Sequence, residues 1–195
     1  MVNGMTLRRS LLLLAYASLT LPVTATTLTF FVQNTYLPNI SPDRWRDSGL
    51  ILASSTATAT ASGLCIGDIP LPPPQFQARQ LFLCDFRQGT LTFSFVDAAK
   101  KSKPAFVDTF LMTVTFRSNT GQSANWKVSA YDLNHNLLQT QTGSTAVQSY
   151  YPRSETIMLF QPNMASVEFE APGGTTNTSV QLVHFDITPL SMNKP

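Results

Sequence analysis

Charged residues and histidines are scarce in this sequence. Only 12% of its 195 residues are charged, with 13 Lys and Arg against 11 Asp and Glu and two histidines, whereas an ordinary soluble domain has about 25% charged residues. No basic cluster is longer than Lys100, Lys101 and Lys103, which argues against nucleic acid and anionic membrane as partners. Nine glycines exclude collagen, and 43% hydrophobic residues predict a real core rather than a disordered chain.

The first 25 residues have the pattern of an export signal. Arg8 and Arg9 precede an apolar stretch through Leu21, and small residues three apart precede Thr26. A membrane anchor is the alternative, but polar residues and a proline interrupt the stretch, which falls short of the roughly 20 residues that span a bilayer. We expect residues 1–25 to be cleaved, leaving one domain over 26–195 that is secreted or periplasmic and has no membrane partner. Losing two arginines leaves 11 basic against 11 acidic residues.

The chain has two cysteines, Cys65 and Cys84, 19 positions apart. In an exported protein such a lone pair is most economically a disulfide. Closing this loop would stabilise the fold by roughly 3 kcal/mol in the chain-entropy model. Two buried free thiols are the alternative. A redox or zinc site is disfavoured, because there is no Cys-x-x-Cys pattern and histidines are few.

Apolar and polar residues alternate with period two along much of the chain. The clearest case is segment 110–116, where Phe110, Met112, Val114 and Phe116 share one face. Segments 91–95 and 165–170 alternate in the same way, and further strands are expected at 27–32, 49–53, 80–85, 125–133, 137–142, 156–160 and 179–187. Since no stretch has sustained helical periodicity, we predict an all-β fold of two packed antiparallel sheets.

Short segments follow one another in a set order: NTY at 34–36, GLIL at 49–52, GTLTFSFVD at 89–97, VSAYDLNHNLL at 128–138, ASVEF at 165–169 and VHFDI at 183–187. Their order and spacing resemble the jelly-roll domain of secreted bacterial proteins of the PEP-CTERM type. The resemblance implies a two-sheet antiparallel jelly-roll β-sandwich, similar to galactose-binding-like modules. The sequence departs from the group in two places: the sorting tail is missing, and His135 stands where such hairpins usually have glycine.

The same resemblance implies a structural calcium ion near the first and last strands, and Asp47 and Asp186 are the residues carried over as its ligands. Asp186 alternates with His184, so an exposed strand position is its alternative. The segment DLNHN at 132–136 superficially matches the start of a calcium loop, but later positions lack the required glycine and glutamate. We therefore predict a hairpin turn there.

Aromatic residues in loops are the candidates for sugar binding, because a ring can cover the apolar side of a pyranose. Trp45 lies in a charged segment that we expect to be an exposed loop, with a structural role equally open. Tyr150 and Tyr151 precede a proline between strands, and they suit either a binding rim or a loop anchor. Trp126 begins a strand and is predicted to belong to the core.

No nucleophile signature occurs. Glu168 and Glu170 lie two apart on an expected strand, a spacing compatible with the carboxylate pair of glycan hydrolysis. Their alternation with Val167 and Phe169 favours a solvated strand face over a catalytic dyad. We therefore expect a secreted, non-catalytic binding protein for a glycan or another extracellular polymer. The alternative is a structural or adhesive envelope protein whose sheet edges meet copies of itself or other chains.

Overall fold

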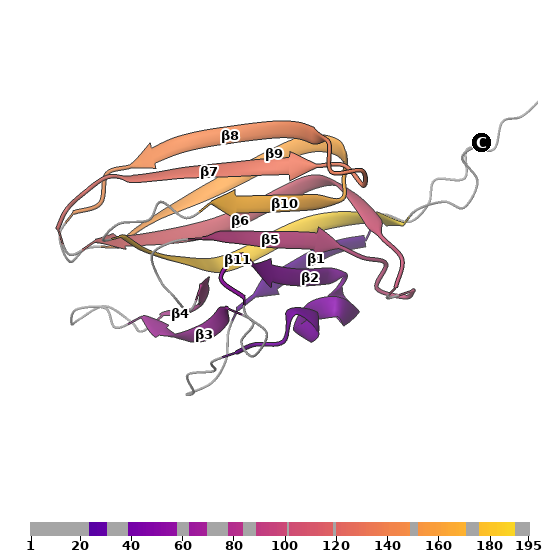
Figure 1. Ribbon diagram of the computed structural model, residues 1–195, viewed down its shortest axis with the longest axis horizontal. Coiled ribbons are helices and arrows are strands. Elements are labelled where there is room, and N and C mark those ends of the chain that lie inside the picture. Colours follow the sequence, from indigo (N-terminus) through magenta and orange to yellow (C-terminus); the bar gives the residue numbers. More distant parts are fainter. Residues whose placement is uncertain are drawn as a thin grey trace, which may run out of the picture.

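Two antiparallel β-sheets packed face to face form the protein (Figure 1). The computed structural model describes residues 24–30, 39–57, 63–69, 78–83, 89–100, 102–118, 120–148, 152–170 and 176–189. The five-stranded sheet has the order β2 (Leu50–Ser54), β5 (Thr90–Phe95), β10 (Ser166–Glu170), β7 (Ala124–Tyr131) and β8 (Leu137–Thr145). The six-stranded sheet has the order β3 (Leu64–Ile69), β4 (Ala78–Leu83), β11 (Thr176–Pro189), β6 (Ala105–Ser118) and β9 (Arg153–Met164), and β1 (Thr24–Thr29) also pairs with β11.

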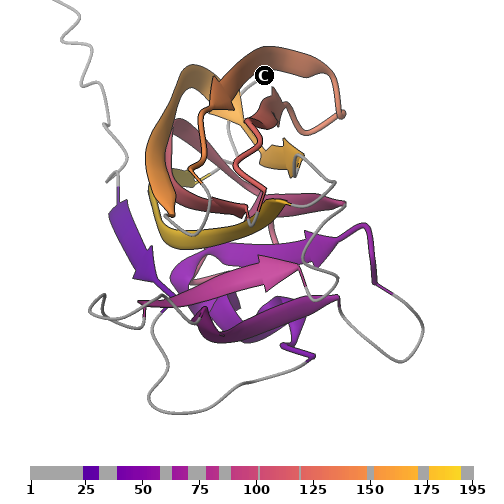
Figure 2. The same cartoon turned by 90° about the vertical axis from the view of Figure 1, so that its left-hand side faces the viewer.

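The connections between strands repeatedly cross from one sheet to the other. From β5 to β11 the chain leaves its sheet at every step except the β7–β8 hairpin. Such crossing between two antiparallel sheets is that of a jelly roll, and Figure 2 shows the sandwich turned by 90° from the first view. The predicted all-β, two-sheet antiparallel jelly-roll sandwich is confirmed. Among the described residues, no helix is both long and apolar enough to cross a membrane.

Phenylalanine rings from both sheets meet in the centre of the sandwich. Phe110 on β6 lies 5.3 Å from Phe93 and 5.9 Å from Phe95, both on β5, measured between ring centroids. Phe95 also contacts Phe185 on β11 at 5.3 Å. All four rings are buried, and so is Phe116, on the same face as Phe110 as predicted. Burial of these rings supplies a large part of the hydrophobic driving force.

The segment around Trp45 is a 3₁₀ helix, η1 (Pro42–Ser48), and not the exposed loop that its charges suggested. Ser41 caps its start by accepting a hydrogen bond from the Asp43 N–H, and Gly49 ends it in the left-handed conformation (φ 86°). These capping residues stabilise a turn that holds Trp45 half-buried against Phe30, edge to face at 5.1 Å. The two caps therefore stabilise a helical turn in a segment whose charged residues predicted an exposed loop.

Strand β3 is absent from the predicted set, because Gly67 and Asp68 interrupt its apolar pattern. It is held by pairing with β4, with Leu64 opposite Leu83. Cys65 follows Leu64 and is buried, whereas Cys84, the residue after Leu83, lies outside the described residues. The Cys65–Cys84 disulfide stays a prediction.

Candidate functional site

Polar side chains cover the outer face of the five-stranded sheet, which Figure 1 shows in front. Cross-strand pairing places Thr90, Glu170, Lys127 and Thr142 in one row, and Thr92, Glu168, Ser129 and Thr140 in the next. We call these eight residues, with Asn125, Ser144 and Tyr131, the polar face. Successive outward residues of one strand lie about 6.6 Å apart. The result is a grid of hydroxyl, carboxylate and ammonium groups.

An ion pair lies at the centre of the polar face. The Lys127 Nζ is 3.0 Å from the Glu170 Oε2, and both side chains are about half exposed. The hydrogen bond and the charge of Glu170 raise the pKa of Lys127 above its ordinary 10.5. An exposed pair of this kind contributes little to stability. The pair places an ammonium and a carboxylate side by side on the sheet.

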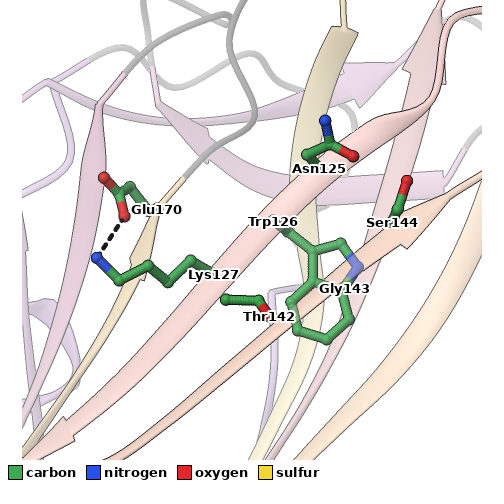
Figure 3. Close-up of a pocket in the computed structure, with 7 residues that line it drawn as sticks. All are labelled: Asn125, Trp126, Lys127, Thr142, Gly143, Ser144 and Glu170. Atoms are coloured by element: carbon green, nitrogen blue, oxygen red, sulfur yellow. Dashed lines mark ion pairs between the residues drawn. The ribbon is translucent and has the colours of Figure 1, made fainter.

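Hollows flank this ion pair on two sides. The larger, of about 630 Å³, is lined by Asn125, Trp126, Lys127, Thr142, Gly143, Ser144 and Glu170 (Figure 3). A smaller and more enclosed one, of about 90 Å³, is lined by Thr90, Lys127, Ser129, Tyr131, Glu168 and Glu170. Because Lys127 and Glu170 belong to both linings, the two hollows are neighbours along the sheet.

Gly143 provides the space that Trp126 occupies beneath the larger hollow. A Cβ atom at Gly143 would overlap the indole ring of Trp126, which pairs with it across the β7–β8 ladder. The indole Nε1–H donates to the Glu155 Oε2 at 2.9 Å and to the Thr145 Oγ1 at 3.2 Å. Trp126 is only 8% exposed, which confirms its predicted place in the core.

The β7–β8 hairpin carries a pair of stacked rings at the end of the polar face. The rings of Tyr131 and His135 lie 4.4 Å apart and 12° from parallel. His135 has a left-handed backbone (φ 62°), which brings its ring over Tyr131. The Asp132 carboxylate accepts hydrogen bonds from the backbone N–H groups of Asn134 and Asn136 and from the Asn136 side-chain amide. The predicted hairpin turn at 132–136 is confirmed.

These hydrogen bonds predict a pH dependence of the hairpin. The side chain and backbone N–H of Asn136 lower the pKa of Asp132 below its ordinary 3.8. A lowered pKa means that stabilisation is present above the ordinary value and is lost as pH falls through the folded-state value. We expect the melting temperature of Asp132→Ala to be lower than that of the parent at pH 7, with the gap shrinking below about pH 4. A gap that stays constant down to pH 2 would contradict this role.

A third hollow lies beyond the stacked rings, at the end of the sandwich. Its volume is about 310 Å³, and its lining includes Arg46 from η1, Ile51 from β2, and Asp132, Leu133 and His135 from the hairpin. Arg46 pairs with Asp43 within η1. The polar face therefore continues into a mixed apolar and polar hollow at the hairpin end.

The structure distributes the residues predicted from the sequence over separate places. Trp45 lies on η1 with the Arg44 guanidinium 5.9 Å from its ring centre, and Tyr150 and Tyr151 lie outside the described residues. Their role in sugar binding stays a prediction.

The predicted calcium ligands also lie on different elements. Asp47 is on η1 and Asp186 is on β11, where Asp186 Oδ1 is 3.7 Å from His184 Nε2. Within the described part of the chain, no group of three or more His, Cys, Asp or Glu side chains could hold a metal ion. Calcium binding stays a prediction.

Tyr131, His135 and Lys127 are site residues that sequence reasoning did not single out. Strand alternation places Tyr131 and Lys127 on one face, which the sequence could have indicated. The pairing of Lys127 with Glu170 depends on the β7–β10 register, which sequence alone does not give. Glu168 and Glu170 share the solvent face, as their alternation with buried residues predicted.

No family model and no curated protein matches the chain. Among solved structures, an arabinose-bound α-L-arabinofuranosidase is similar at 16% identity and a TM-score of 0.45, over 81% of this chain and 25% of that enzyme. A family 29 carbohydrate-binding module is similar at 12% identity and a TM-score of 0.38, over 84% of this chain and 90% of the module. A family 6 carbohydrate-binding module is similar at 15% identity and a TM-score of 0.36, over 71% of this chain and 93% of the module.

Proposed function

We propose that this protein binds a glycan chain on its polar face, without cleaving it, outside the cytoplasm. The observation that carries the proposal is the Lys127–Glu170 pair between two hollows, with the stacked Tyr131 and His135 rings at one end. Hydroxyls both donate and accept hydrogen bonds, so a grid of hydroxyl, carboxylate and ammonium groups matches a polyhydroxylated ligand. Aromatic rings beside such groups supply the apolar contact that orients a sugar.

The shape of the polar face favours an extended ligand. Its outward residues on β7, from Asn125 to Tyr131, span about 20 Å at 3.3 Å per residue, which is several sugar rings long. Its hollows are open along the sheet and do not form one deep cavity. An internal stretch of a polysaccharide fits this surface.

The charges of the polar face favour a neutral glycan. Glu168 and Glu170 carry two negative charges against the single positive charge of Lys127. The Lys127 ammonium is already paired with Glu170, so an anionic sugar would face repulsion without a free cation. Uronic acids and sulfated sugars are therefore the weaker ligands in this proposal.

A glycan array on residues 26–195, followed by calorimetry on the best-bound oligosaccharide, tests the proposal. We expect neutral glycans to bind and Lys127→Met to weaken binding by about 10- to 100-fold, the usual worth of hydrogen bonds to a charged group. Tyr131→Ala should weaken binding as well. Phe160→Ala, which removes a 61% exposed ring from the other sheet, is the matched control and should bind normally.

Two results would contradict the proposal. One is the absence of glycan binding on the array. The other is equal loss of affinity in Tyr131→Ala and Phe160→Ala, since the ligand would then not distinguish the two faces. Release of new reducing ends during incubation, abolished in Glu168→Gln, would instead establish the hydrolase that the Glu168 and Glu170 pair left open.

A further inference from the structure

Strand β8 is an edge strand with an unusual sequence for that position. It forms one rim of the five-stranded sheet (Figure 1), and in the described part of the chain it pairs only with β7. Its nine residues, LLQTQTGST, contain neither charge nor proline. An edge strand presents a row of unpaired N–H and C=O groups, which proteins usually guard with charges, proline or shortness. Strand β8 has none of these three guards, and its one irregularity, a register shift next to Leu137, lies at its first residues and leaves Gln139–Thr145 regular.

The other edges of the described sheets carry such guards. Strand β9 is long, but it contains Arg153, Glu155 and Pro162. Strand β3 has six residues and includes Asp68, and β1 has six residues. Strand β2 has only five residues, and η1 packs against it. Strand β8 therefore differs from the other described edge strands, which carry a charge or a proline or are short.

We propose that β8 pairs antiparallel with β8 of a second copy of this chain, forming a dimer with a continuous ten-stranded sheet. The partner is a second copy because β8 is complementary to itself. With Gln141 at the centre, Thr140 of one copy lies opposite Thr142 of the other, which is a favourable cross-strand pair, and no like charges meet anywhere along the strand. A two-fold axis through the middle of β8 places Gln141 opposite its own counterpart.

Pairing through β8 stops at a dimer. A two-fold pairing uses the same edge on both chains, so no unguarded β8 edge is left for a third copy. Residues directly opposite in an antiparallel pair share one face of the sheet. The exposed Thr140, Thr142 and Ser144 of the two copies therefore lie on the same side, and the two polar faces join. The dimer goes beyond the proposed glycan binding and does not depend on it.

Sedimentation velocity on the full mature chain, from low micromolar to millimolar concentration, tests the dimer. We expect a reversible monomer–dimer equilibrium, and we expect Gln141→Lys to remain monomeric over the same range because two ammonium groups would meet at the two-fold axis. Gln141 is exposed, so the fold should survive, which circular dichroism checks. Ala53→Lys places the same charge on an exposed residue of β2, the opposite edge, and should dimerise like the parent.

Oxidative cross-linking of Gln141→Cys gives a second, independent readout. Opposed residues of an antiparallel pair have Cα atoms roughly 4.5–5.5 Å apart, within the range of a disulfide. We expect a covalent dimer from Gln141→Cys and none from Ala53→Cys. A parent chain that is monomeric up to millimolar concentration would overturn the proposal. So would growth into open-ended polymers, or equal cross-linking of the two cysteine variants.

Discussion

Replacing Phe110 by alanine is expected to lower the free energy of unfolding by about 3–5 kcal/mol. Phe110 is fully buried and its ring contacts Phe93 and Phe95 from the facing sheet. Its removal takes away apolar burial and leaves a cavity between the two layers, where neighbouring rings cannot close the gap without moving a strand. For a domain of this size the melting temperature should fall by roughly 10 °C.

Phe160→Ala is the matched control for this substitution. It removes the same side chain from β9, the strand that pairs with β6, but from a position that is 61% exposed. Its effect should stay within about 0.5 kcal/mol. Chemical denaturation of the two variants measures the difference directly. If both variants lost a similar free energy of unfolding, then Phe110 would not lie in the interior while Phe160 lies on the surface.

Adding a single methyl group at Gly143 is expected to destabilise the protein by about 1–3 kcal/mol, the usual cost of overpacking. The sign of this change in stability is informative, because replacing glycine by alanine inside a strand ordinarily stabilises a protein by roughly 0.5–1 kcal/mol. Here the new Cβ would overlap the Trp126 ring. That ring is buried and held through its Nε1–H by Glu155 and Thr145, so moving it aside would break these hydrogen bonds.

The neighbouring substitution Ser144→Ala is the control, since Ser144 is exposed and points outward on the same strand. It should leave the unfolding midpoint nearly unchanged. In Gly143→Ala, displacement of the indole should also shift the tryptophan fluorescence. If Gly143→Ala stabilises the chain, then Trp126 does not occupy the space beneath β8, and the larger hollow has a different floor.

Period-two burial made most of the fold predictable. The alternation around Phe110 and Phe116 identified β6, and the same pattern identified β5 and β10, because each strand has one face in the core. Strand β3 escaped prediction because Gly67 and Asp68 break its pattern, and pairing with β4 compensates. The helical turn η1 escaped because capping by Ser41 and Gly49 is a local effect that composition does not display.

The candidate site was less predictable, because it arises from register and turn geometry. Alternation predicted that Glu168 and Glu170 share a solvated face, but only the strand order brings Lys127 beside Glu170. Stacking of His135 on Tyr131 depends on a left-handed backbone at His135. Non-glycine residues adopt that conformation only occasionally. The resemblance marked position 135 as one where such hairpins usually have glycine, but nothing in the sequence indicated that a ring there would stack on Tyr131.

Titration of the ¹⁵N-labelled protein with the best-bound neutral oligosaccharide, followed by nuclear magnetic resonance, tests the central claim most directly. If the polar face binds the glycan, the largest amide shifts fall on β5, β7, β8 and β10 and on the 132–136 hairpin, and the six-stranded sheet stays unperturbed. Shifts concentrated on β6, β9 and β11 would place the ligand on the opposite face and contradict the account.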